Sequence, residues 1–299
     1  MLEIDIDDCK LSRKRSILKY ILRNACVFES ENGFHFTDYL DQLENISPTI
    51  DPSALTDEVR RYIEQDLQKN HERYSRHVKL VESFMNLGGS HCLDIGCGGG
   101  RFLSELKTRG AEVHGIEPND GRAHYAQTTY GLILSKLPVD HNYWQNGYRN
   151  TFDLITLWDV IEHVNLPFLT LRASRNLLRV GGFLMLDTPC KDSYYYRLGE
   201  LSQKITKGYW PGFLDILYKD EPFGHKQIFS TTEMKVMLAL SGFKCVSMIR
   251  IHELSFPMAY YFRRLRYPDL IARFLGVTVG WIVRLFHVRN KMVIVAQRT

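Results

Sequence analysis

Apolar runs of strand length alternate with helically spaced segments through most of the chain. The strand-like runs are 92–95, 111–116, 132–134, 152–157, 183–187, 245–251 and 291–297. Segments with apolar residues at helical spacing lie between them, at 101–108, 120–130, 166–178 and 231–240. The run 152–157 is almost continuously apolar, which is typical of a central parallel strand buried on both faces. The pattern predicts parallel strands joined by helices.

The first part of the chain has helical spacing as well. The pattern from Leu11 to Val27 predicts a helix, and Thr56 is placed to cap a long helix that runs to Val81. This second helix either packs on the core or also covers a bound cofactor. We expect residues 1–75 to form a helical extension or lid, and residues 76–299 to form the main domain.

A glycine-rich turn follows the first strand of the main domain. The stretch from His91 to Arg101 holds one acid, Asp94, and glycines at 96, 98, 99 and 100 before a helix begins. Such a turn exposes backbone N–H groups, and glycine lets a ligand approach them closely. This predicts a nucleotide-type site. A dinucleotide fingerprint would need glycine where Arg101 stands, and no Gly-Lys-Ser or Gly-Lys-Thr sequence completes a phosphate loop.

Four ordered motifs resemble those of class I S-adenosylmethionine-dependent methyltransferases. Residues 93–100 resemble the first motif, 115–119 the second strand with its ribose-binding acid, 152–164 the fourth strand and its loop, and 178–189 the fifth strand. The resemblance implies an α/β fold: a Rossmann-like, mostly parallel seven-stranded sheet with helices on both faces, and 245–251 with 291–297 as its antiparallel edge hairpin. It also implies S-adenosylmethionine as cofactor and S-adenosylhomocysteine as product.

The resemblance assigns donor-binding roles to individual residues. Gly96 to Gly100 would hold the methionine part, Asp94 its ammonium group and Glu117 the ribose hydroxyls. The predicted donor-binding residues are Asp94, Gly96, Cys97, Gly98, Gly100, Glu117, Pro118, Asn119, Trp158 and Asp159. Ser135-Lys136-Leu137 stands where the family commonly has an acid or amide for adenine, so backbone groups and Leu137 are expected to hold the adenine instead.

Three interpretations compete for the turn after the fourth strand. His163 can act as general base on the acceptor, because an imidazole titrates near neutrality. Glu162 and His163 can instead brace the turn. In the third, less favoured interpretation, Asp159, Glu162 and His163 bind Mg²⁺, Mn²⁺ or Zn²⁺, since their spacing is similar to that of the ubiquinone-pathway O-methyltransferases. His225 is a second base candidate, or a turn histidine.

Two insertions are expected to shape the acceptor site. Residues 190–228 are rich in aromatic side chains and follow the fifth strand, where the resembled family has acceptor-binding insertions. Residues 254–290 are a basic helical insertion, and between Arg250 and Thr299 nine Lys or Arg stand against two acids. This insertion is either a helical pair on the sheet edge or a peripheral membrane surface or acceptor pocket. Its apolar stretch 274–283 is too short to span a bilayer.

Composition narrows the class of protein. A chain of 299 residues with 44% apolar residues can bury a large core, and a net charge of +4 is too small to indicate nucleic-acid binding. Six cysteines without a Cys-x-x-Cys pair indicate a reducing, cytoplasmic setting. We expect methyl transfer to a small molecule, most simply at a hydroxyl of a phenol, sugar or lipid-linked metabolite. The alternatives are a non-catalytic S-adenosylmethionine-binding scaffold or sensor and, disfavoured by Arg101, a dinucleotide oxidoreductase.

Overall fold

A seven-stranded sheet forms the centre of the computed structural model, which describes residues 16–299 except 32, 43–45, 211, 255–256 and 286–287. Its strands lie in the order β10 (Phe243–Ile251), β11 (Lys291–Arg298), β8 (Leu178–Pro189), β7 (Phe152–Trp158), β4 (His91–Ile95), β5 (Glu112–Ile116), β6 (Ile133–Ser135). The strands from β8 to β6 pair in parallel, whereas β11 is antiparallel to both of its neighbours. The predicted fold class and edge hairpin are confirmed.

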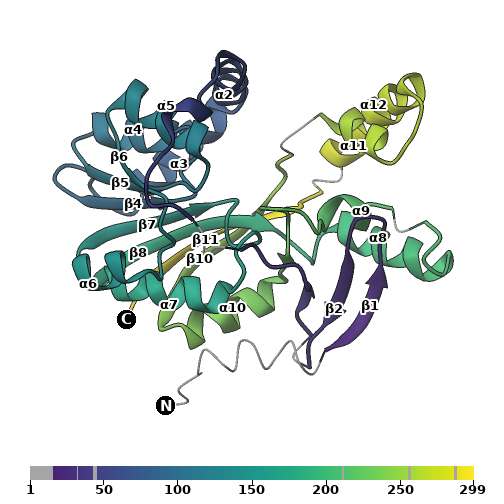
Figure 1. The fold of residues 1–299 in the computed structure, drawn as a ribbon. Helices are drawn as coiled ribbons and strands as arrows, with labels where there is room; N and C mark the ends of the chain where they lie inside the picture. The colour runs from purple at the N-terminus through teal and green to yellow at the C-terminus, as the bar shows by residue number, and fades with distance from the viewer. Residues whose placement is uncertain (1–15, 32, 43–45, 211, 255–256, 286–287) are drawn as a thin grey trace.

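Helices cover both faces of this sheet (Figure 1). One face carries α3 (His71–Glu82), α4 (Arg101–Thr108) and α5 (Asp120–Tyr130), and the other carries α6 (Asn142–Gly147), α7 (Pro167–Leu177) and α10 (Thr231–Leu240). Successive strand residues point to opposite faces, so Leu154 and Met185 pack with α3 and α4 while Ile155 and Leu186 pack with α7 and α10. The two hydrophobic cores hold the strand ends in place.

A smaller four-stranded sheet joins two parts of the chain that are far apart in sequence. Its order is β1 (Ile17–Ile21), β2 (Cys26–Glu29), β3 (His35–Thr37), β9 (Gln227–Ile228), with β9 coming from the aromatic insertion. Tyr20 and Val27 pack with Tyr196 and Tyr218 of the same insertion, which also forms α8 (Tyr194–Ile205) and α9 (Leu214–Leu217). The N-terminal segment is therefore built into the insertion.

The helix predicted at Leu11–Val27 is wrong over its described part, which forms β1 and β2; residues 11–15 lie outside the described residues. Apolar spacing in a short segment fits both periods, and here the decision comes from packing. Tyr20 and Leu22 point inward while Ile17 and Ile21 stay exposed, which is strand alternation. The predicted extension is thus partly a sheet.

The single helix expected from Thr56 to Val81 is also wrong, because the chain forms α2 (Asp57–Lys69) and then α3. Thr56 does cap α2, accepting a hydrogen bond from the Val59 amide. The break falls at Asn70, whose side-chain amide donates to the backbone carbonyl and carboxylate of Asp66. Asparagine side chains compete with the helical backbone in this way.

Two further elements differ from the predicted pattern. Residues 138–150, for which the pattern predicts no helix, contain α6, which His141 caps through its ring Nδ1. The predicted strand 183–187 is part of the longer β8, which begins at Leu178 directly after α7 and includes Gly181 and Gly182.

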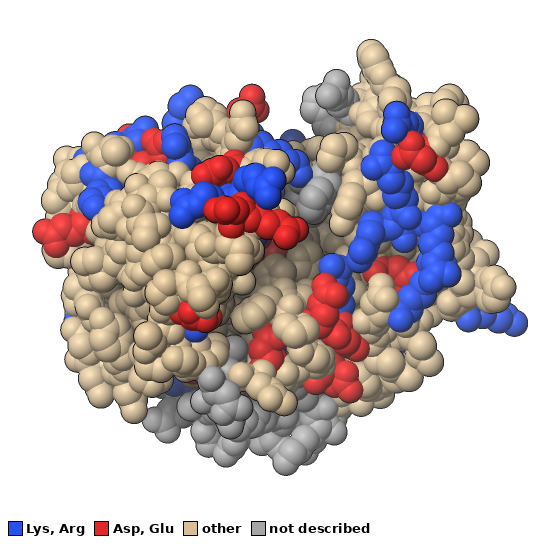
Figure 2. Space-filling model, turned by 45° about the horizontal axis from the view of Figure 1, so that its top comes forward, with Lys and Arg blue, Asp and Glu red and all other residues tan. Residues whose placement is uncertain are grey.

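The basic insertion forms two helices, α11 (Met258–Arg264) and α12 (Asp269–Leu285), which stand at the upper right of Figure 1. Figure 2 shows Lys and Arg gathered over this side of the molecule. A close contact joins the pair, since a Cβ at Gly276 would lie 2.8 Å from the Ala259 backbone nitrogen. In the part of the chain that the structure describes, no helix is long and apolar enough to cross a membrane.

A buried ion pair ties the aromatic insertion to the N-terminal segment. The Lys226 side chain is fully buried and its ammonium lies 2.8 Å from a carboxylate oxygen of Asp41. The backbone of Asp41 exchanges two hydrogen bonds with the Asn165 side chain, and its carboxylate accepts from the Phe223 amide. These contacts hold the turn after β7 against the insertion.

Removal of the Asp41 carboxylate should therefore destabilise the fold strongly. We expect Asp41→Ala to lower the free energy of unfolding by about 3–5 kcal/mol, because it leaves a buried ammonium without its partner. Urea unfolding followed by circular dichroism measures this change. The exposed Asp38 is the matched control, and Asp38→Ala should shift stability by less than about 0.5 kcal/mol. Equal effects of the two substitutions would contradict the structural role of the pair.

Candidate functional site

The glycine turn after β4 has the backbone geometry that only glycine adopts easily. Gly96, Gly98 and Gly100 have φ angles of +72°, +55° and +79°. Space is restricted as well, since a Cβ at Gly96 would lie 2.5 Å from Val160 and one at Gly100 would lie 2.6 Å from Leu132. The turn opens α4 and packs directly against the loop that follows β7.

Glu117 lies over this turn at the carboxyl end of β5. Its carboxylate is buried and accepts hydrogen bonds from the backbone amides of Gly98, at 2.7 Å, and Asn119, at 2.9 Å. Burial raises the pKa of Glu117, an effect that these hydrogen bonds partly offset. The sequence-predicted acid and the sequence-predicted loop are therefore in direct contact.

Asp94 is the second carboxylate among the residues that are predicted to bind the donor. It is buried at the end of β4 and accepts a hydrogen bond of 2.6 Å from the Thr156 hydroxyl on β7. Burial raises the pKa of Asp94 to about 7. A cation placed beside such a carboxyl group would stabilise its charged form and lower its pKa, which fits the ammonium-binding role predicted for Asp94.

The other predicted donor-binding residues have local structural contacts. The Cys97 thiol is buried where a Cβ at Gly115 would meet it at 2.8 Å, so it fills the space beside β5. The Asn119 side chain caps α5 by accepting from the Arg122 amide, and Pro118 stands between it and Glu117. Lys136, expected near the adenine, pairs with Asp120 at 2.7 Å. These side-chain contacts fix the backbone of the segments that are predicted to bind the donor.

Trp158, which is also predicted to contact the donor, is the last residue of β7. Its ring stacks on His77 of α3 with centroids 3.8 Å apart and planes 9° from parallel, and it packs edge-on against Phe102. His77 in turn makes a contact of 3.1 Å with Asp187. Burial lowers the pKa of His77, so the ring stacks on Trp158 in its neutral form at neutral pH.

Asp159 belongs to a buried charge cluster that the sequence did not reveal. Its carboxylate pairs with Arg73 of α3 at 2.6 Å and with Lys291 of β11 at 2.5 Å, and Lys291 also lies 2.9 Å from Asp187 of β8. Burial alone would raise the pKa of both acids, but the positive charges of Lys291 and Arg73 outweigh it and lower both values. Glu253 closes the cluster, 3.1 Å from Lys291.

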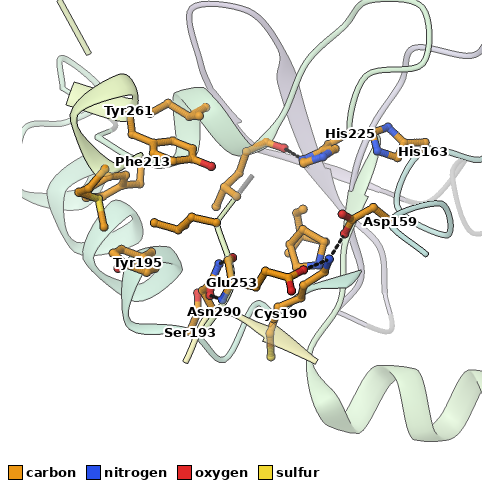
Figure 3. Close-up of a pocket in the computed structure, with 17 residues that line it drawn as sticks. Asp159, His163, Cys190, Ser193, Tyr195, Phe213, His225, Glu253, Tyr261 and Asn290 are labelled. Carbon is orange, nitrogen blue, oxygen red and sulfur yellow. Dashed lines mark hydrogen bonds and ion pairs between the residues drawn. The ribbon is translucent and has the colours of Figure 1, made fainter. Parts of the chain in front are cut away.

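A cavity of about 240 Å³ opens beside this cluster. Figure 3 shows its two kinds of wall: aromatic side chains on one side, and the histidines with the charged cluster on the other. The aromatic and apolar wall comes from the two insertions. The polar end comes from the turn after β7, the end of the aromatic insertion, the residues that follow β10 and the start of β11. The lining residues include Tyr195, Phe213, Ile216, Met258 and Tyr261 on the first side, and Asp159, His163, His225, Glu253 and Lys291 on the second.

Both histidines predicted as bases lie at the polar end of the cavity, with ring centroids 4.6 Å apart. His163 Nδ1 lies 2.7 Å from the Phe223 carbonyl and His225 Nδ1 lies 2.9 Å from the Leu217 carbonyl. A carbonyl only accepts, so each Nδ1 carries the hydrogen and each Nε2 keeps its lone pair. Burial lowers the pKa of His163 and lowers that of His225 to about 3, so both rings are neutral at neutral pH.

Glu162 lies next to the two histidines. Its side chain is fully buried, one oxygen accepts from the Thr188 hydroxyl at 3.0 Å, and the other has no hydrogen-bond partner within the described chain. Burial raises the pKa of Glu162 well above its usual range. The ligand atoms of Glu162, His163 and His225 lie within 4.8 Å of one another, which suits a divalent metal ion.

The possible metal ligands that the structure groups differ from those of the metal interpretation of the sequence. The structure groups Glu162 and His163 with His225, and Asp159 does not belong to this group. The carboxylate of Asp159 is bound by Arg73 and Lys291, and the positive φ of 54° at Asp159 turns the chain sharply before Glu162. His225 sits 62 positions along the chain from His163, and only the tertiary fold brings it here.

Comparison with known proteins agrees with this geometry. Residues 58–248 match a family model described as a methyltransferase domain. A ubiquinone biosynthesis O-methyltransferase of Colwellia psychrerythraea is 27% identical over 188 residues, covering 60% of this chain and 72% of that protein. The same-named protein of Stutzerimonas stutzeri is 29% identical over 130 residues, so the chain spans only 55% of its length and 42% of this chain is covered.

Solved structures share the fold at lower identity. An S-adenosylmethionine-dependent methyltransferase from Archaeoglobus fulgidus is 16% identical with a TM-score of 0.52, covering 77% of this chain and 94% of the other. The [4+2]-cyclase SpnF is 18% identical with a TM-score of 0.50, covering 75% and 80%. Such similarity reports the fold and not the reaction. The matched domain, which contains the glycine turn, Asp94 and Glu117, identifies the chain as a member of the class I S-adenosylmethionine-dependent methyltransferases.

Proposed function

We propose that this methyltransferase methylates a hydroxyl group of a small amphipathic acceptor, such as a phenol, a sugar derivative or a lipid-linked metabolite. One observation carries the proposal: two neutral imidazoles present free Nε2 lone pairs at the polar end of a cavity whose other wall is aromatic. A hydroxyl acceptor needs a base that removes its proton, and the apolar or aromatic part of the acceptor would pack against the aromatic wall. The ubiquinone biosynthesis relatives, which are O-methyltransferases by name, support an oxygen acceptor.

The donor side follows from the predicted roles. Glu117 would accept hydrogen bonds from the ribose hydroxyls, Asp94 would pair with the donor ammonium group, and the amides of Gly96 to Gly100 would bind the methionine part. Val160 touches the glycine turn and is followed two residues later by Glu162, so the donor turn and the polar end of the cavity share one short loop. Alignment of this kind supplies about 7–11 kcal/mol of barrier lowering.

The transfer itself is an in-line displacement. The acceptor oxygen forms a bond to the methyl carbon while the bond from that carbon to the sulfonium sulfur breaks, and the electron pair stays on sulfur. His163 Nε2 takes the hydroxyl proton, because its Nδ1–H is held by the Phe223 carbonyl and its ring is neutral. His225 is the second candidate for this base, and Asp159 and Lys291 fix the loop on which His163 stands.

A divalent metal ion is the alternative at the same place. Glu162, His163 and His225 offer two imidazole nitrogens and one carboxylate oxygen, and the second oxygen of the buried Glu162 lacks a partner among the described residues. A metal there would lower the pKa of an acceptor hydroxyl bound to it. The histidine tautomers suit both alternatives, because an Nδ1–H held by a carbonyl leaves Nε2 available to a proton or to a metal ion. We take the metal-free base as the proposal, and the EDTA experiment below separates the two.

Loss of Glu117 should weaken donor binding. We expect Glu117→Ala to lower the affinity for S-adenosylmethionine roughly 10- to 100-fold, since it removes hydrogen bonds to a charged group. Isothermal titration of the donor measures the dissociation constant. Glu112 is an exposed acid at the other end of the same strand, and Glu112→Ala should leave the constant unchanged. A Glu117→Ala protein that is folded and binds normally would contradict the ribose role.

Donor affinity should depend on the ionisation of Asp94. The pKa of about 7 means that the free protein is protonated there below neutral pH, and the donor cation favours the carboxylate. We expect the dissociation constant of S-adenosylmethionine to rise as pH falls from 7 to 5, by up to about tenfold per unit. Asp94→Asn should bind more weakly and lose this pH dependence. A wild-type titration that is flat between pH 5 and 7 would exclude the ammonium contact.

Acceptor chemistry and the base can be tested together. We expect S-adenosylhomocysteine to form with 4-octylcatechol or octyl glucoside, and His163→Ala to lower kcat about 10²- to 10⁴-fold with donor binding intact. Activity should survive EDTA. Loss of activity in EDTA with recovery on adding Mg²⁺, Mn²⁺ or Zn²⁺ would assign the metal alternative. Turnover of 4-octylaniline but of neither hydroxyl probe would overturn the oxygen acceptor.

A further inference from the structure

Helix α12 has two apolar faces, and only one of them is packed. Ala272 and Val283 are buried, and Gly276 lies against Ala259 of α11 so closely that a side chain there would meet it. These residues and the partly buried Val279 share one side of the helix, since they recur every three or four positions. The packed face accounts for the position of α12 in the fold.

The opposite face exposes large apolar side chains. Leu270, Phe274, Val277 and Trp281 recur at steps of four, three and four, and their exposed fractions are 81%, 68%, 62% and 72%. At 100° per residue they fall within a strip about 60° wide. A contiguous strip of exposed apolar side chains marks an interaction site in soluble proteins. Nothing in the part of the chain that the structure describes covers this strip.

Positive charge surrounds the strip. Arg263, Arg264, Arg266 and Arg273 are exposed around the start of α12, and Asp269 is the single acid in the sequence from 256 to 290. Arg263 and Arg273 share that acid, each at 2.7 Å, so the region keeps a net positive charge. Figure 2 shows the resulting band of Lys and Arg on this side of the molecule.

We propose that α12 docks on the surface of an anionic phospholipid bilayer, with Leu270, Phe274, Val277 and Trp281 entering the headgroup boundary and the arginines meeting lipid phosphates. An apolar strip flanked by arginine is the pattern of an interfacial helix, and the helix is too short to span. A second copy of the chain fits less well, because a two-fold contact through this strip would bring the arginine groups of both copies together.

The docking surface goes beyond the proposed function and does not depend on the acceptor. It also adjoins the cavity, because Met258 and Tyr261 of α11, which packs on α12, line the apolar wall. The proposed docking helix and one wall of the cavity therefore belong to the same pair of packed helices.

Vesicle flotation of the full chain tests the proposal. The wild type should float with vesicles of equimolar phosphatidylglycerol and phosphatidylcholine, bind pure phosphatidylcholine vesicles much less, and dissociate progressively as salt is raised. We expect the double variant Phe274→Glu/Trp281→Glu to lower the partition coefficient at least about tenfold. Trp281 fluorescence should shift to the blue on binding, and Trp281→Phe should bind while losing most of that shift.

The matched control places the same charges on apolar residues of the main sheet. Ile133 and Val180 are 63% and 72% exposed, and Ile133→Glu/Val180→Glu should bind vesicles as the wild type does. Donor titration verifies that every variant is folded, and it also separates failure of docking from failure of the methyltransferase assignment. A wild type that ignores anionic vesicles, or that forms a dimer which Phe274→Glu/Trp281→Glu dissociates without vesicle binding, would overturn the proposal.

Discussion

The buried charge cluster around Lys291 is the constraint on which the site depends. One ammonium group lies between carboxylates of three different segments, Asp159 after β7, Asp187 on β8 and Glu253 after β10, and Arg73 of α3 adds the second positive charge. Loss of the Lys291 ammonium would leave the fully buried Asp187 carboxylate without its nearest cation, and breaking a buried pair in this way costs about 3–5 kcal/mol. The cluster therefore fixes the carboxyl ends of β7 and β8 against the antiparallel strand β11.

The cluster also positions the loop that links the glycine turn to the cavity. Asp159 is held with positive φ, so the chain leaves β7 in a sharp turn, places Val160 on the glycine turn and directs His163 toward the cavity. The backbone amide of Lys226 fixes this loop from the insertion, because it donates to the Glu162 carbonyl. The proposed donor site and the proposed acceptor cavity therefore share one short loop, which suits a reaction in which positioning supplies most of the rate.

The two insertions give the common fold its particular cavity. The class I sheet supplies the glycine turn, Asp94 and Glu117, and none of these touches the apolar wall of the cavity. That wall is built by Tyr195 and Phe213 from one insertion and Met258 from the other, and their packing cluster is separate from both cores of the sheet. If the cavity holds the acceptor as proposed, acceptor choice can change with the insertions while the sheet and its glycine turn stay constant, which is how one fold serves many substrates.

The sequence alone predicted the seven-stranded fold and the glycine turn with Asp94 and Glu117, which the structure places at neighbouring strand ends. These residues lie close together along the chain at the ends of successive strands, and glycine spacing, a strand-terminal acid and apolar runs are local signals that survive without coordinates. Only the tertiary structure brings together the residues that line the cavity. His225 joins His163 across 62 residues, and Arg73 and Lys291 bind the Asp159 carboxylate that the metal interpretation would have used. Residues 17–29 become strands in a small sheet in which β2 pairs with β3, and β3 pairs with β9 of the aromatic insertion. Pairing of distant residues depends on loop closure and packing, for which a single chain carries no local pattern.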